Sequence, residues 1–181
     1  MKKLVLLLLI TFPFILIGQD KYIDFQNDEL QFSYPDTYTM SERRILQDIS
    51  VKLISNIVSS DGGNDNIGVN LNSMYSSLND IERKKLISGI QNELEMAGEK
   101  MGVRVEFTIL SYDSKTIDGK EIIAVTQKTD FPDNNVKMFQ MMYIYVKNKK
   151  SCFISLTSGT SQELYEKEQD INYILKTLVV L

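Results

Sequence analysis

The stretch "VKMFQMMYIYV" (residues 136–146) is apolar on both faces if it forms a β-strand, because alternate side chains of a strand point to opposite sides. One face carries Met138, Met142, Ile144 and Val146, and the other carries Phe139, Met141, Tyr143 and Tyr145. A strand that is covered on both sides lies inside its sheet, with other elements packed above and below it. We therefore expect this strand to be central in a sheet that has a layer on each face.

Tight turns between the strands predict that the sheet is mainly antiparallel. Residues 147–150 ("KNKK") form a polar tip between it and an alternating strand at 151–158. Earlier in the chain, Asp118-Gly119 is a typical two-residue turn between strands at 103–109 and 120–129. Links as short as these join neighbouring antiparallel strands, whereas parallel strands need a long crossover.

The segment "YIDFQNDELQFSYP" (22–35) predicts a β-hairpin that opens the domain. Two alternating apolar runs are joined by Asn27-Asp28, and Pro35 ends the pairing because proline has no N–H to donate. We expect this hairpin to pair within the main sheet, with Phe32 and Tyr34 on an apolar face beneath a helix.

The chain between this hairpin and the first helix contains further strands. Alternating apolar residues predict strands at 49–53 and 67–71, whereas residues 36–47 are polar and are predicted to be irregular. The segment "SSDGGNDN" (59–66) consists of turn formers and predicts a loop. Its acids and amides depart from the spacing of an EF-hand, and weak calcium binding by this loop stays open as an alternative.

A first amphipathic helix is predicted from about Asp80 to Met101. Asn79 and Glu82 have the spacing of a capping pair, and Gly102 stands where a C-terminal glycine belongs. The apolar stripe of this helix comprises Ile87, Ile90, Leu94, Ala97 and Met101.

A second helix is predicted to begin at Thr160, with Glu163 as its capping partner. Its apolar stripe comprises Leu164, Ile171, Ile174, Leu175 and Leu178. Two amphipathic helices and one strand with two apolar faces require helices on both sides of the sheet. The expected fold class is therefore α+β, a mainly antiparallel sheet in an α/β/α sandwich.

Residues 1–18 are similar to a secretory signal peptide. Two lysines precede an apolar run at 4–17, and Gly18 is a small residue at its end. We expect cleavage between Gly18 and Gln19, a mature single domain at 19–181, and secretion to the periplasm or out of the cell. The run is shorter than the ~20 residues that span a bilayer, so no transmembrane span is expected in the mature chain. An uncleaved N-terminal anchor is the alternative.

Charge and cysteine content narrow the choice of partners. The full chain has 20 basic and 24 acidic residues, and removal of the two lysines in the leader leaves 18 basic residues against 24 acidic ones. An acidic domain repels phosphate backbones, so no nucleic-acid partner is expected. Cys152 is the single cysteine and shares a strand face with Ile154 and Leu156, so we expect a buried, unpaired and inert thiol.

The residue types that carry most enzymatic chemistry are missing from the sequence. There is no histidine, no Walker loop, no G-x-G-x-x-G motif and no C-x-x-C pair, so we expect no enzyme, no cofactor and no residues that form a catalytic, cofactor or metal site. Three methionines that could hold Cu(I), Met138, Met141 and Met142, divide between the two faces of one strand and indicate core filling. Four acids near strand ends leave acid-only hydrolysis as an alternative: Asp113, Asp118, Asp130 and Asp133.

The order of elements resembles the PsbP-like superfamily, which includes the extrinsic photosystem II protein and many small exported bacterial proteins. Its exported members often show an aromatic-Tyr-Pro motif followed by a tryptophan, and Tyr38 stands where that tryptophan would be. The resemblance implies this fold and an accessory or binding role without a shared enzymatic site. The matching stretches are "LQFSYPDTY" (30–38), "TIDGKEIIAVTQ" (116–127), "MFQMMYIYVKNKKSCFISLTSGT" (138–160) and "YEKEQDINYILKTL" (165–178).

Three functions follow from these observations. The first is an exported, non-enzymatic binding or accessory protein that acts on an unknown protein partner through its surface. The second is a carrier of an apolar small molecule in the cell envelope, which would be held between the sheet and the long helix. The third is an acid-only hydrolase.

Overall fold

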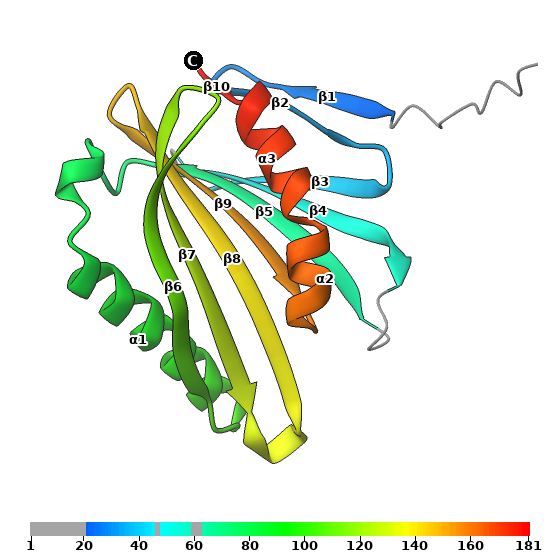
Figure 1. Ribbon diagram of the computed structural model, residues 1–181, viewed down its shortest axis with the longest axis vertical. Coiled ribbons are helices and arrows are strands. Elements are labelled where there is room, and N and C mark those ends of the chain that lie inside the picture. Colours follow the sequence, from blue (N-terminus) through cyan, green and yellow to red (C-terminus); the bar gives the residue numbers. More distant parts are fainter. Residues whose placement is uncertain (1–20, 46–47, 59–62) are drawn as a thin grey trace, which may run out of the picture.

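The computed structural model describes residues 21–45, 48–58 and 63–181. In this part of the chain a large antiparallel sheet of seven strands forms the centre of the molecule (Figure 1). Its strands lie in the order β3 (Tyr38–Ile45), β4 (Asp48–Val58), β5 (Asn64–Asn72), β9 (Lys150–Ser158), β8 (Val136–Lys147), β7 (Lys120–Phe131) and β6 (Glu106–Ile117).

The strand with two apolar faces has the place that its sequence predicts. β8 lies inside the sheet between β9 and β7, one strand from its centre. Tyr143 is fully buried on one face, and Ile144 is fully buried on the other. Two predicted hairpin turns are also confirmed: Asp118 and Gly119, between the strands at 106–117 and 120–131, adopt positive φ angles, as do the two residues at the tip between β8 and β9.

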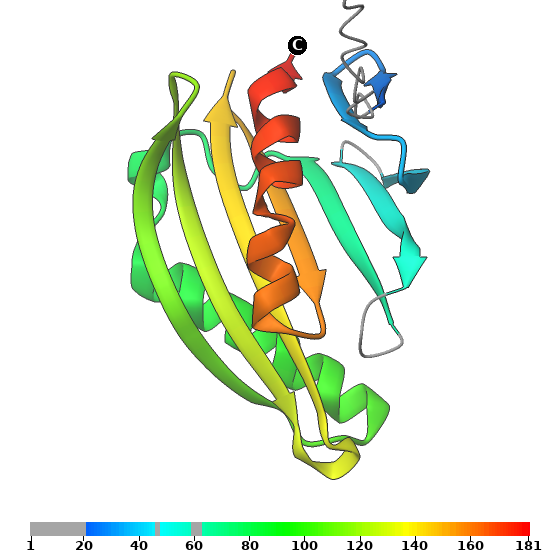
Figure 2. The same ribbon diagram turned by 45° about the vertical axis from the view of Figure 1, so that its right-hand side comes forward.

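Helices cover both faces of the large sheet, which confirms the α+β sandwich (Figure 2). On one face lie α2 (Ser161–Glu166) and α3 (Glu168–Thr177), which pack against β9, β8 and β2. On the other lies α1 (Arg83–Met101), preceded by the short 3-10 turn η1 (Leu78–Asp80). A second 3-10 turn, η2 (Pro132–Asn134), joins β7 to β8.

The N-terminal hairpin forms, but it does not join the large sheet as predicted. β1 (Tyr22–Gln26) and β2 (Leu30–Pro35) pair with the C-terminal β10 (Val179–Val180) in a separate sheet of three strands within the described residues. The chain end thus occupies the free edge of β2, and the Leu181 N–H donates to the Glu29 carbonyl at 2.9 Å. After Pro35 the chain turns at once into β3, in the other sheet.

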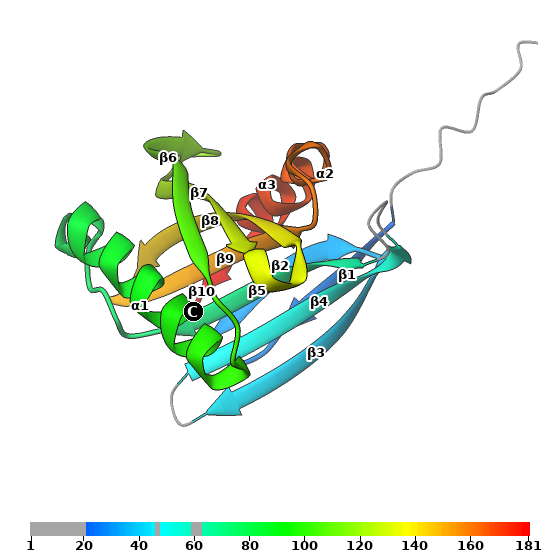
Figure 3. The same cartoon turned by 90° about the horizontal axis from the view of Figure 1, so that it is seen from below.

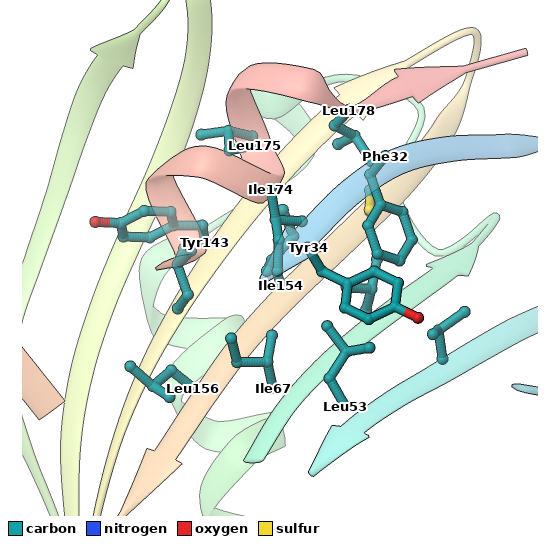
Figure 4. Packing of buried hydrophobic residues seen from close by; sticks show 14 of the residues in the cluster. Phe32, Tyr34, Leu53, Ile67, Tyr143, Ile154, Leu156, Ile174, Leu175 and Leu178 are labelled. Carbon is teal, nitrogen blue, oxygen red and sulfur yellow. The ribbon is translucent and has the colours of Figure 1, made fainter. Parts of the chain in front are cut away.

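The main core lies between the small sheet, the C-terminal helices and the large sheet (Figure 4). Phe32 and Tyr34 of β2 point into it, as expected, and face Leu53 and Ile67 of the large sheet. The predicted stripe of the last helix is confirmed, because its five apolar residues are all buried. The cap at Thr160 is also confirmed, since its hydroxyl accepts from the Glu163 N–H at 3.2 Å.

Two buried tyrosines attach α3 to the large sheet by hydrogen bonds. The Tyr38 hydroxyl donates to Asp170 at 2.7 Å, and the Tyr143 hydroxyl donates to Glu168 at 2.6 Å. Burial raises the pKa of both phenols well above the ordinary value, and the adjacent carboxylates raise it further. Both hydroxyls are therefore protonated hydrogen-bond donors near neutral pH.

Two expectations about local structure are wrong. Residues 38–45 form the edge strand β3 and are not irregular; an edge strand next to solvent needs few apolar residues, and its alternation is therefore hidden. The first helix begins at Arg83, and Asn79 lies in the preceding 3-10 turn, which Ser77 caps by accepting from the Asn79 N–H at 3.1 Å.

The last helix is interrupted at Lys167, whose side chain turns inward to Asp65 of β5.

Cys152 is fully buried in the main core, and burial raises the pKa of its thiol to about 12. Because the thiolate is the reactive form, we expect a maleimide to label native Cys152 at least ~100-fold more slowly than the unfolded chain at pH 7. Labelling followed by intact-mass measurement checks this expectation. Labelling at the same rate with and without denaturant would contradict it.

Candidate functional site

A cleft of about 370 Å³ lies between α1 and the large sheet. Figure 3 shows α1 lying along one side of the sheet, opposite α2 and α3. Volumes of roughly 300–1,000 Å³ are typical of small-molecule sites. The apolar part of the lining consists of Leu86 and Ile90 from α1, Met142 and Phe153 from the sheet, and Met74 and Tyr75 from the segment before α1.

The floor of the cleft changes from apolar to polar across the strands. Met142 of β8 pairs with Ser155 of β9, and Phe153 of β9 pairs with Asn70 of β5. These side chains share the α1 face because they alternate with the buried residues of the main core. The cleft therefore has an apolar inner end below α1 and a neutral polar end of amides and hydroxyls above β5 and β9.

Two glycines of α1 differ in the space that surrounds them. At Gly98 a Cβ would come 2.5 Å from Cγ2 of Val105 and 2.8 Å from the carbonyl oxygen of Val103, so the helix is in close contact there. At Gly89, which lines the cleft, a Cβ would meet nothing within 4 Å. The helix thus lies close to the following segment near its C-terminal end, whereas Gly89 in its first half is exposed at the cleft.

The predicted apolar stripe of α1 is only partly correct. Leu86 and Gly98 are the buried positions of the helix, whereas Ala97 and Met101 are exposed, the latter to 61%. Ile87, Ile90 and Leu94 of the predicted stripe are half-buried, and the close contact at Gly98 was not predicted because periodicity of large apolar residues does not detect a glycine. At its start the helix is held by Arg83, whose guanidinium lies 4.9 Å from the ring centroid of Tyr112 on β6.

The polar groups of the cleft differ in whether they are already paired. Asn72 accepts from the Met74 N–H at 3.0 Å and from the Ser151 hydroxyl at 2.5 Å. Gln140 accepts from Gln127 at 2.7 Å. Within the described residues, the side chains of Asn70 and Ser155 have no hydrogen-bond partner in the protein, so they remain available to a ligand.

Charged groups occur only at the rim of this lining. Lys85 is paired with Glu82 at 2.7 Å, and both side chains are exposed. Glu93 is the single carboxylate among the described residues that line the cleft. The interior consequently offers hydrogen bonds without a net charge.

We expect Gly98→Ala to lower the free energy of unfolding by about 1–3 kcal/mol, since overpacking against backbone cannot be relieved by a rotamer change. Gly89→Ala should raise it by about 0.5–1 kcal/mol, because alanine favours a helix and fits the open space. Urea melts of the two variants measure the contrast. Equal effects at both glycines would contradict the packing described above.

The residues considered for chemistry in the sequence lie apart from this cleft, with the exception of Met142. Gly18 and Gln19 lie outside the described residues, as does part of the loop 59–66. Met142 lines the cleft, whereas Met141 is buried in the main core and Met138 is 36% exposed, so the three do not converge. Among the described residues, no group of three or more acids and cysteines is placed to hold a metal ion.

The four acids considered for hydrolysis do not line the cleft. Asp130 is paired with Lys128 at 2.7 Å, and Asp133 accepts from the Arg104 N–H at 2.8 Å. Asp113 lies on β6, and Asp118 forms the turn before β7. Sequence reasoning missed the cleft residues, although the run "NDNIGVNLN" (64–72) places amides on one face of a strand and was a usable signal.

Comparison with known structures identifies the fold. The solution structure of cyanobacterial PsbP (CyanoP) from Synechocystis sp. PCC 6803 is similar with a TM-score of 0.58 and 10% identity, over 91% of this chain and 95% of that one. A variant of the protein Mog1 gives a TM-score of 0.54 and 12% identity, over 90% of this chain and 96% of that one. No family model and no curated protein sequence matches the chain.

The fold is therefore PsbP-like, as the sequence resemblance predicted. At identities this low, the structural similarity establishes the arrangement of the elements. It carries no functional residue from one protein to another. Within the described residues, no helix combines the length and the apolar character that are needed to cross a membrane.

Proposed function

We propose that this chain is an exported, non-enzymatic binding protein that holds an apolar small molecule in the cleft between α1 and the large sheet. The observation that carries the proposal is the cleft itself, in which an apolar inner end adjoins unpaired neutral polar groups. Sites for small molecules combine these two features: an apolar lining provides affinity, and a few polar groups fix the orientation of the ligand.

The lining favours binding over catalysis. The sequence has no histidine to act as a general base near neutral pH. Acid-only hydrolysis requires two facing carboxylates, and Glu93 is the single carboxylate in the described lining. The ligand is thus expected to leave the cleft chemically unchanged.

A protein partner is the second candidate. The apolar side chains of Ile57 and Val58, at the end of β4, are 59% and 62% exposed. Apolar residues that gather on a surface are typical of protein interfaces. In this case the chain would act as an accessory subunit, and the cleft would be incidental.

Native mass spectrometry of the protein purified from its own cell envelope distinguishes the two candidates. The proposal predicts a stoichiometric adduct of a few hundred daltons that is lost on extraction with organic solvent. A co-purifying polypeptide without a small adduct would favour the accessory role. A protein that carries neither would contradict both proposals.

Export is tested at the N-terminus of the same preparation. We expect the mature chain to begin at Gln19, because the small residue Gly18 ends the apolar run of the leader. Intact-mass measurement and N-terminal peptide analysis check the cleavage site. Retention of Met1 on a membrane-bound protein would show an uncleaved anchor instead.

A further inference from the structure

The glycine at position 89 occupies a place where a larger residue would stabilise the helix. Gly89 lies in the interior of α1, where glycine is less favourable than alanine by about 0.8–1.0 kcal/mol. No atom of the protein lies within 4 Å of the Cβ that alanine would bring, so packing does not require a glycine there. Gly98 is the contrast within the same helix, because there the protein itself excludes a side chain.

Gly89 lines the cleft and is exposed, so the space at its Cβ position opens both to the cleft and to solvent. Leu86, one turn before it on the helix, and the adjacent Ile90 also line the cleft, and Leu86 is buried. A group that enters between them can contact the helix backbone at Gly89, a close approach that a Cβ would prevent. On the floor opposite are Met142 and Phe153. The inner end of the cleft thus fits an apolar group held between the helix backbone and the sheet.

The outer end of the cleft sets the chemistry of the remainder of the ligand. Asn70 offers an amide donor and an amide acceptor, and Ser155 offers a hydroxyl. A Cβ at Gly68 would lie 3.0 Å from the Ser155 hydroxyl and 3.5 Å from the Asn70 amide nitrogen, so these two groups are neighbours on the floor. An alcohol, ester, ketone or amide can hydrogen-bond to both.

An ionised ligand is disfavoured by the charges at the rim. A carboxylate in the cleft would find Lys85 already paired with Glu82 and would lie near the unneutralised Glu93. For a cation, the described lining of the cleft provides one exposed carboxylate, Glu93, and no buried carboxylate. Burial of a charge without a partner is strongly unfavourable.

We infer that the ligand is an uncharged amphipathic molecule, with its apolar group against Gly89 and a neutral oxygen-bearing or amide head on Asn70 and Ser155. This inference rests on the proposed function and narrows it to one chemical class. Medium-chain alcohols and other neutral lipid-like molecules belong to this class, whereas fatty acids and phospholipids do not.

Two matched pairs of probes test the charge of the ligand. N-phenyl naphthylamine and anilinonaphthalene sulfonate share their aromatic body, and only the second carries a negative charge. We expect saturable binding of the neutral probe to the wild-type protein, and at least ~10-fold weaker binding of the sulfonate, about 1.4 kcal/mol. Decanol should displace the neutral probe at least ~10-fold more effectively than decanoate at pH 8.

Variants of α1 test the location. Gly89→Leu should lower the affinity for the neutral probe at least ~10-fold by filling the space. Gly89→Ala should lower this affinity severalfold while raising the urea midpoint. Ser88→Leu is the matched control, because Ser88 is exposed on the same helix and does not line the cleft. It should bind the probe as the wild type does. A urea melt of each variant confirms that it is folded.

A double variant tests the polar head. Asn70→Ala with Ser155→Ala should weaken displacement by decanol about fivefold or more while the affinity for the neutral probe changes less, since each neutral hydrogen bond contributes about 1 kcal/mol. Equal effects on both molecules would contradict the assigned orientation.

The outcomes separate this inference from the proposed function. If both fluorescent probes bind equally and both are lost in Gly89→Leu, the cleft is the binding site and the inference of an uncharged ligand is wrong. If Gly89→Leu binds the neutral probe as the wild type does, the cleft is not the site, and both proposals fail. Discrimination between the charged and neutral probes that disappears in Gly89→Leu supports both.

Discussion

Replacement of Phe32 by alanine is expected to lower the free energy of unfolding by about 3–5 kcal/mol, the usual range for emptying a buried aromatic site. Phe32 is 1% exposed and lies in the main core between the small sheet and the large one. Its ring centroid lies 5.0 Å from that of Phe25 and 6.2 Å from that of Tyr34, so its removal also takes away aromatic contacts. The loss is a large share of the ~5–15 kcal/mol that typically stabilises a domain.

Urea denaturation of Phe32→Ala measures this loss, with Ile23→Ala as the matched control in the same hairpin. Ile23 is 41% exposed, so its truncation should change the free energy of unfolding by about 0.5 kcal/mol or less. The hairpin is a structural element if the two variants differ in this way. A Phe32→Ala protein that unfolds at the wild-type midpoint would show that residues 22–35 are peripheral and would make them a candidate interaction surface.

Replacement of Lys167 by methionine is expected to lower the free energy of unfolding by about 3–5 kcal/mol, because it leaves a buried carboxylate without its cation. The Lys167 ammonium contacts Asp65, which is 1% exposed and whose Oδ1 has no hydrogen-bond partner among the described residues. Lys167 stands at the break between α2 and α3, and its side chain links this break to β5. Methionine keeps the apolar stem and removes both the charge and the hydrogen-bond donor to Asp65.

A double-mutant cycle shows whether the loss comes from the unpaired charge. Asp65→Leu with Lys167→Met removes both charges and should recover most of the lost free energy, since apolar replacements of buried pairs are often neutral. Lys85→Met is the control at an exposed pair and should cost about 0.5 kcal/mol or less. If the double variant is no more stable than Lys167→Met alone, the unpaired charge is not the cause.

Periodicity predicted those parts of the fold in which one face of an element is buried. The last helix and the strands at 49–53, 67–71 and 151–158 were predicted because apolar residues recur at the period of the element. The edge strand β3 was missed because solvent on its exposed side removes that signal. The pairing of β10 with β2 was missed because the two strands are far apart in the sequence, and local sequence patterns do not predict such a pairing.

The cleft could not be predicted in full from the sequence. A carrier site between the sheet and the long helix was anticipated as an alternative, but its residues were not. The opening depends on how α1 lies over the sheet, and the close contact of Gly98 with Val103 and Val105, in the segment that follows the helix, leaves no periodic signal in the sequence. The usable signal was the alternation of asparagines in β5, which indicated a polar patch on one strand face. No periodic pattern shows that this patch adjoins an apolar space beneath a helix.

A crystal structure of the protein isolated from its own cell envelope tests the central claim most directly. The account predicts electron density for one small molecule in the cleft, with its apolar part against Gly89 and its polar end within hydrogen-bond distance of Asn70 or Ser155. A cleft that is filled only by water in that structure, or a ligand bound on another face of the molecule, would contradict it.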